Sequence, residues 1–221
     1  MKPIIFSTEN VKALLDGRKT MARLPIKHQP DKSAQFKQIS CGWACFEIDI
    51  GMWNIMLPHQ PGDVLWVRET FARHNKGVAY KADSDQRKIK ILKGFWEPPL
   101  HMPREDARLF LRVTDVRVER VQDISEEDAI REGIMYTDFG MNEDMGKLSV
   151  DGGETFHELK PRHYPGYHAG GATNPSQCVY TARSAFAGEW DDRNAKRGYG
   201  WDTNPFCWVI EFKRIEKGTE S

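Results

Sequence analysis

Apolar residues alternate with polar ones in separate short runs spread along the whole chain. The run 206–212 has one apolar face, formed by Phe206, Trp208, Ile210 and Phe212. In the run 109–121 the apolar parity changes after Val113, which predicts a β-bulge near Thr114 and Asp115. Because strands of this kind must bury one face, the chain needs a sheet whose strands come from distant parts of the sequence.

Two further strands are expected in the first half of the chain. The segment 64–70 follows a Pro-Gly turn, and its Trp66 and Arg68 share one face. The opposite face carries Leu65, Val67 and Glu69. A shorter β-rich run at 77–81 includes Tyr80. Aromatic and basic side chains are therefore expected on a single strand face.

Three helices are expected between these strands. The segment 7–16 has Ser7 or Thr8 as its cap, apolar residues at helical spacing and a terminal Gly17. A second, short helix begins at Ser125, which is followed by three acids that favour a helix N-terminus. A third helix presents one apolar face, made of Ala182, Ala185, Phe186 and Trp190.

Single strands with helices between them favour an α+β fold over a doubly wound sheet. The stretches 28–61 and 137–176 show little periodicity. We expect both to be insertions, the first with one short strand near 46–50 and the second a long mobile loop. The 221 residues then form a single domain, 1–221, and the sequence has no glycine-rich phosphate loop, HExxH or G-x-S-x-G motif.

The charge of the chain is balanced overall but unevenly distributed. Lys plus Arg and Asp plus Glu each number 32, so the strong positive field typical of duplex-binding proteins is missing. Residues 1–37 hold eight basic and three acidic side chains, whereas residues 115–158 hold four basic and thirteen acidic ones. This asymmetry indicates either a basic face for a polyanion or complementary solvated surfaces.

The N-terminal segment and the cysteines bear on the compartment. Polar residues from Ser7 to Asn10 interrupt the first apolar run before a signal-peptide core could form, and no stretch has transmembrane length. The four cysteines are scattered through a chain large enough to fold without disulfides. We therefore expect a cytoplasmic protein that has no membrane partner.

Cysteines and histidines in or next to the two aperiodic stretches raise the question of zinc. The candidates are Cys41, Cys45, His157, His163, His168 and Cys178. Their spacings do not form the paired knuckles of a structural zinc site. We expect no metal and no cofactor.

Four motifs in order resemble the ASCH family of the PUA-like superfamily. They are Leu14-Leu-Asp-Gly17-Arg-Lys19-Thr20, Pro61-Gly-Asp-Val-Leu65, Ile124-Ser-Glu-Glu-Asp-Ala-Ile-Arg-Glu132-Gly133 and Trp208-Val-Ile-Glu-Phe212. The segments 66–70, 101–103 and 204–208 are similar to the larger, phage- and prophage-associated type. The resemblance implies a small PUA-like β-barrel with two or three surrounding helices and a cleft that binds RNA, nucleosides or modified bases.

The resemblance also suggests an enzyme. A small bacterial member is an N4-acetylcytidine amidohydrolase that uses a lysine, a threonine and a glutamate, which match Lys19, Ala22 and Glu132. Alanine offers no nucleophile, so an amidohydrolase would need Thr20 or a water activated by Lys19. The general family pattern is met at Gly17 and Lys19 but not at Ala22 and Leu24. We expect Ala22 to face the cleft and to tolerate threonine.

Three functions follow as expectations. The first is binding of RNA, single-stranded nucleic acid or a modified nucleoside. Aromatic faces would stack bases and basic groups would meet phosphates, through Lys19, Arg23, Trp66, Arg68 and Tyr80. The second is amidohydrolysis of an acylated base with Lys19, Glu132 and Thr20. The third is a phage assembly or interaction protein that uses the two insertions, with a protein partner that the sequence does not identify.

Overall fold

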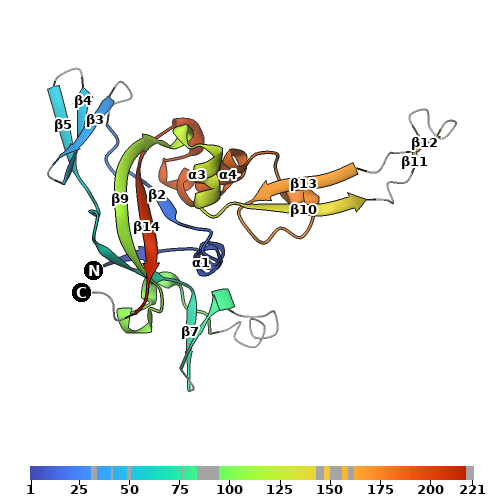
Figure 1. The fold of residues 1–221 in the computed structure, drawn as a ribbon, viewed down its shortest axis with the longest axis horizontal. Coiled ribbons are helices and arrows are strands. Elements are labelled where there is room, and N and C mark those ends of the chain that lie inside the picture. Colours follow the sequence, from blue (N-terminus) through green and yellow to red (C-terminus); the bar gives the residue numbers. More distant parts are fainter. Residues whose placement is uncertain are drawn as a thin grey trace.

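The computed structural model describes residues 1–30, 34–40, 42–48, 51–75, 77–83, 95–142, 147–149, 156–158 and 162–217. Its centre is a five-stranded sheet in the order β1-β6-β9-β14-β2 (Figure 1). The strands are β1 (Lys2–Ile5), β6 (Val64–Arg68), β9 (Phe110–Arg120), β14 (Phe206–Ile215) and β2 (Met21–Pro25). β1 and β6 are parallel, and the other neighbours are antiparallel.

One face of this sheet carries the largest core cluster. Helix α1 (Thr8–Leu15) covers part of it with Val11 and Leu14. A three-stranded sheet covers another part, formed by β3 (Gln35–Ser40), β4 (Trp43–Ile48) and β5 (Gly51–Met56). Its Phe46 packs edge-on against Phe206 of β14, with ring centroids 5.1 Å apart. The β3–β5 sheet is therefore an integral wall of the core.

The opposite face is covered in two halves. Helices α3 (Glu126–Arg131) and α4 (Ala182–Asn194) pack over the half that contains β2 and the start of β14. The other half is covered by β7 (Phe71–His74), β8 (Gly77–Tyr80) and segment 99–107, which enclose Trp66 and Phe110. Short 3-10 turns connect these elements, at Lys81–Asp83, Pro99–His101, Arg104–Asp106, Val121–Asp123, Pro175–Gln177, Ala195–Arg197 and Trp201–Thr203.

Two antiparallel ribbons lie outside the central sheet. β10 (Met135–Asn142) pairs with β13 (Arg162–His168), and this ribbon points away from the rest of the molecule (Figure 1). β11 (Lys147–Ser149) pairs with β12 (Phe156–Glu158). No helix in the described ranges is long and apolar enough to cross a membrane.

The regular elements expected from the sequence are confirmed. Ser7, Ser125 and Thr181 cap α1, α3 and α4, each accepting a hydrogen bond from a backbone N–H of the first turn. All four apolar residues expected on the third helix are buried. The predicted bulge is also present, because Glu211 pairs with Asp115 and Phe212 with Val113, which leaves Thr114 as the extra residue.

Three expectations require correction. The described sheets do not close into one barrel, so the coarse α+β class is confirmed without the PUA-like closure. The stretch 28–61 contains three strands instead of one, because the side chains of Ala44 and Phe46 are buried in the core cluster. The stretch 137–176 contains paired strands instead of a long loop. These strands pair through their backbones without an alternating apolar face, which is why the sequence pattern did not predict them.

Candidate functional site

Lys19 and Glu132, both predicted site residues, form a buried ion pair. Lys19 lies between α1 and β2, and Glu132 is the C-cap residue of α3. Lys19 Nζ donates to Glu132 Oε2 at 2.8 Å and to the Glu132 carbonyl at 2.6 Å. Both side chains are only 1% exposed. The pair therefore holds the end of α3 against β2.

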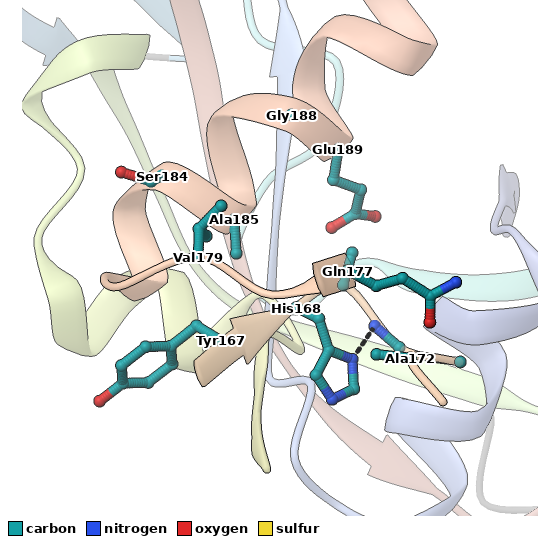
Figure 2. A pocket seen from close by; sticks show the side chains of 12 residues that line it. Tyr167, His168, Ala172, Gln177, Val179, Ser184, Ala185, Gly188 and Glu189 are labelled. Carbon is teal, nitrogen blue, oxygen red and sulfur yellow. Dashed lines mark hydrogen bonds between the residues drawn. The ribbon is translucent and has the colours of Figure 1, made fainter. Parts of the chain in front are cut away.

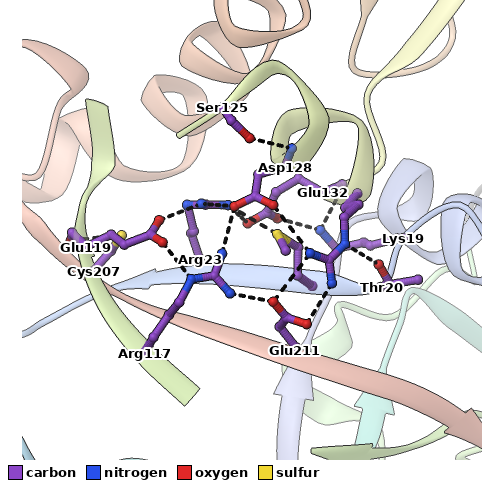
Figure 3. A network of polar contacts seen from close by, with 12 residues as sticks. Lys19, Thr20, Arg23, Arg117, Glu119, Ser125, Asp128, Glu132, Cys207 and Glu211 are labelled. Carbon is purple, nitrogen blue, oxygen red and sulfur yellow. Dashed lines mark hydrogen bonds and ion pairs between the residues drawn. The ribbon is translucent and has the colours of Figure 1, made fainter. Parts of the chain in front are cut away.

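A larger ion-pair network surrounds this contact. Arg23 Nη1 lies 3.4 Å from Glu132 Oε1, and Arg23 Nη2 donates to Glu119 and Asp128 at 2.7 and 2.9 Å. The network contains four basic and four acidic side chains: Lys19, Arg23, Arg117, Arg131, Glu119, Asp128, Glu132 and Glu211 (Figure 3). The charges cancel, which leaves none unmatched for a phosphate.

The pKa values in the network follow from this pairing. Burial lowers the pKa of Arg23, but the charge of Glu132 and hydrogen bonds to Asp128 and Glu119 raise it by more, so the net pKa is raised. Burial also opposes ionisation of Asp128, yet hydrogen bonding and charge from Arg23 hold its pKa below the usual value. Arg23 and Asp128 are therefore both charged at neutral pH.

Thr20 and Ala22 have different surroundings, although both are close to Lys19 in sequence. Thr20 Oγ1 accepts a hydrogen bond from Arg131 Nε at 3.3 Å. Ala22 is 3% exposed and belongs to the core cluster on the other face of β2 from Arg23. The expectation that Ala22 faces a cleft beside Lys19 and Glu132 is wrong, because strand alternation turns its side chain into the core.

Trp66, Arg68 and Tyr80 gather elsewhere, since β9 and β14 separate β6 from β2. Trp66 is buried, and the Arg68 guanidinium lies 4.7 Å from its ring centroid. The buried Arg68 Nε has no hydrogen-bond partner in the described part of the chain. Tyr80 stacks under Arg108, whose guanidinium also binds Glu69 through two hydrogen bonds. The predicted residues thus form two separate groups.

One cavity, of about 340 Å³, lies between α4 and the segment that follows β13 (Figure 2). Its His168 accepts from Gly170 N–H at Nδ1, so the proton lies on Nε2, which is 2.8 Å from Thr137 Oγ1. Burial lowers the pKa of His168. Glu189 accepts from Asn10 at 2.8 Å. The main polar side chains of this cavity are therefore already paired.

A second cavity, of about 440 Å³, lies between β2, β14 and β5. Leu24, Ile26, Ile55 and Trp208, the last only 5% exposed, supply its apolar lining. Exposed Lys27, His28 and Arg197 lie at its rim, and no described acidic residue lines it. We call it the Trp208 cavity. Sequence reasoning missed it, although the basic excess of residues 1–37 was a signal.

Two hydrogen bonds position the edges of the Trp208 cavity. Tyr199 donates from its hydroxyl to the Lys27 carbonyl at 2.7 Å, and its ring lies 5.8 Å from the Arg197 guanidinium carbon. At the other edge Lys2 Nζ donates to the Pro58 carbonyl at 2.6 Å. A third cation, after Lys27 and Arg197, therefore lies next to a residue that lines the cavity.

Fold and site together define an α+β protein with an open, apolar cavity that is rimmed by cations and, on the other face of β2, a charge-balanced ion-pair network. The described residues include no group of three or more His, Cys, Asp or Glu side chains that could hold a metal ion. Comparison of the chain with protein-family models, curated proteins and solved structures gave no match.

Proposed function

We propose that the chain binds a base of single-stranded nucleic acid, or the corresponding nucleotide, in the Trp208 cavity. The observation that supports this most is the combination of apolar walls with two rim cations, Lys27 and Arg197, and no described acid. A base can lie against Leu24 and the Trp208 indole while its phosphate meets Lys27 or Arg197. The ordered motifs that resemble the ASCH family favour the same class of ligand.

The arrangement of charge favours this cavity over the Lys19 site that the sequence suggested. Lys19 and Arg23 are buried and matched by carboxylates, so a phosphate would have to displace Glu132 or Asp128 from them. Lys27 and Arg197 are exposed at the rim and could meet a ligand without breaking a buried pair. The contacts of Lys19 and Arg23 fit a role in orienting α3 against β2 better than direct binding of the ligand.

A titration of the purified chain with nucleoside monophosphates and nucleosides at low salt tests the proposal. We expect the monophosphate to bind more tightly than the nucleoside, and Lys27→Ala to weaken monophosphate binding about tenfold, because it removes a charge-assisted contact. Lys213→Ala, which removes an exposed lysine of β14 outside the cavity lining, is the matched control. Absence of binding by any nucleotide or nucleoside would contradict the proposal.

A second candidate is hydrolysis of an acylated base such as N4-acetylcytidine. The direct contact between Lys19 Nζ and the Glu132 carboxylate is the observation that favours it. Hydrolysis would consume one water and release acetate and cytidine, with Thr20 or a water activated by Lys19 as the nucleophile and Glu132 passing the proton to the departing amine. Cytidine release from N4-acetylcytidine, abolished by Lys19→Ala in protein that still folds, would support this activity. No release by the wild-type chain would exclude it for that substrate.

A further inference from the structure

The outer face of β4 and β5 continues from the rim of the Trp208 cavity. Met56 lines the cavity and is 63% exposed. Its register partner on β4 is Trp43, whose side chain is 40% exposed. Neighbouring strands lie about 4.8 Å apart, so the Trp43 indole lies one strand away from the cavity rim.

Strand alternation places Trp43 on the outer face. Ala44 is fully buried against the core, so the preceding residue of β4 points away from it. Met52 of β5 is also exposed on this side, at 57%. The one described acid of β4, Glu47, is paired with Lys37. An exposed indole beside an apolar cavity is consistent with a binding surface that extends beyond the cavity.

The cations flank this surface on two sides. Lys27 and Arg197 lie at the cavity, and Lys2 is held at Pro58 near the end of β5. Lys2 lies 3.9 Å from Asp63, an exposed and weak pair that a phosphate could replace. A nucleic-acid strand complements both features, because its phosphates match the cations and its bases match the apolar surface. An acidic protein surface would match only the cations, and a purely apolar partner would match only the apolar surface.

We propose that Trp43 is a second base-stacking position, so that the ligand is a single strand of at least two nucleotides, with one base in the Trp208 cavity and its neighbour on the Trp43 indole. This inference rests on the proposed function. Aromatic faces stack any base, so the second position extends the strand without reading its sequence. The intervening phosphate lies near Met56 and Pro58, between Lys2 and Lys27.

The test compares a nucleoside monophosphate with a hexanucleotide of the same base. Trp43→Ala should weaken hexanucleotide binding by about 5- to 150-fold and leave monophosphate binding unchanged. Trp43→Phe should retain most of the hexanucleotide affinity, because it keeps an aromatic face. Tyr180→Ala is the matched control, since Tyr180 is 97% exposed before α4, outside the cavity lining.

The outcomes separate this inference from the proposed function. Unchanged hexanucleotide affinity in Trp43→Ala, with both ligands binding the wild type, overturns the second stacking position alone. Equal loss for both ligands also overturns it, because Trp43 would then act through the cavity wall. If the wild-type chain binds neither ligand, the proposed function fails and the inference with it. Intact monophosphate affinity in Trp43→Ala shows that the cavity itself is still folded.

Discussion

Lys19 has almost no exposed surface, and both of its acceptors belong to one residue, Glu132. A buried pair of this kind adds little net stability compared with apolar residues, but the loss of one partner leaves a charge without compensation. Arg23 Nη1, at 3.4 Å, would be the nearest remaining cation for Glu132. Lys19 is therefore important for stability chiefly because its removal would leave the buried Glu132 carboxylate without its closest cation.

We expect Lys19→Met to lower the free energy of unfolding by about 3–5 kcal/mol, because Glu132 loses its closest cation in a buried site. Urea denaturation at pH 7 measures this change. Lys12→Met on α1 removes a partly exposed lysine paired with Glu9 and should change stability by less than about 0.5 kcal/mol. A change below 1 kcal/mol for Lys19→Met would mean that the pair is not buried as described.

A substitution at Ala22 distinguishes the cleft position expected from the sequence from the core position in the structure. Its neighbours in the core cluster include Ile210, the residue opposite it on β14. Ala22→Thr would bury a hydroxyl there, at a cost of about 1–3 kcal/mol, or about 2–4 °C in melting temperature for each kcal/mol in a chain of this size. We expect lower melting by differential scanning fluorimetry and no amidohydrolase activity. Wild-type melting together with new activity would restore the original assignment.

At the scale of elements, α3 is tied to β9 and β14 by carboxylates. Hydrogen bonding from Arg131 is the largest effect that lowers the pKa of Glu211, and Arg23 and its neighbours lower that of Asp128 against the effect of burial. Folded-state pKa values below the unfolded ones give stability that is present above about pH 4 and is lost as the pH falls through the folded values.

The unfolding free energy should therefore fall as the pH decreases from about 5 toward 2. Glu211→Gln should be less stable than the wild type at pH 7 and should show a shallower fall over the same range, because one of the linked carboxylates is gone. Urea denaturation at half-unit pH intervals provides both slopes. Parallel curves for the two proteins would show that Glu211 contributes nothing to the acid sensitivity.

The elements that the sequence predicted are those in which local pattern and burial agree. The face of β14 with Phe206 and Trp208 and the cap at Ser125 were readable because each signal lies within a few residues. The three strands between 35 and 56 were not, since a register shift between Phe36 and Gln38 breaks the alternation. The Trp208 cavity was out of reach because Lys27 and Arg197 are distant in sequence and meet only through tertiary packing.

At the scale of the whole molecule, equal numbers of acids and bases hide a local excess of positive charge. The carboxylates of the 115–158 region include Glu119, Asp128 and Glu132, which neutralise buried cations. Lys27 and Arg197 face solvent at the cavity rim. A neutral protein can therefore still show salt-dependent binding at one site.

For single-stranded nucleic acid, each neutralised phosphate contributes about 0.7 to the slope of log affinity against log salt concentration. We expect Lys27→Ala to reduce the slope for the hexanucleotide by about 0.7. Lys213→Ala changes the net charge equally and should leave the slope unchanged. Fluorescence anisotropy between 25 and 200 mM salt, concentrations of the order over which such slopes are measured, provides the comparison. Equal slopes for all three proteins would place Lys27 away from the phosphates.

The order of strands in the central sheet sets a constraint on how the chain is made. β14 is the last strand of the described chain, yet it lies between β9 and β2, with Met21 opposite Glu211. At typical translation rates of 5–20 residues per second, the interval between synthesis of these two strands is on the order of 10–40 s. During that time β2 cannot pair with β14, and the apolar faces of the earlier strands belong to an incomplete sheet. Slower growth and chaperone supply should therefore raise the yield of folded protein more than changes to its finished surface.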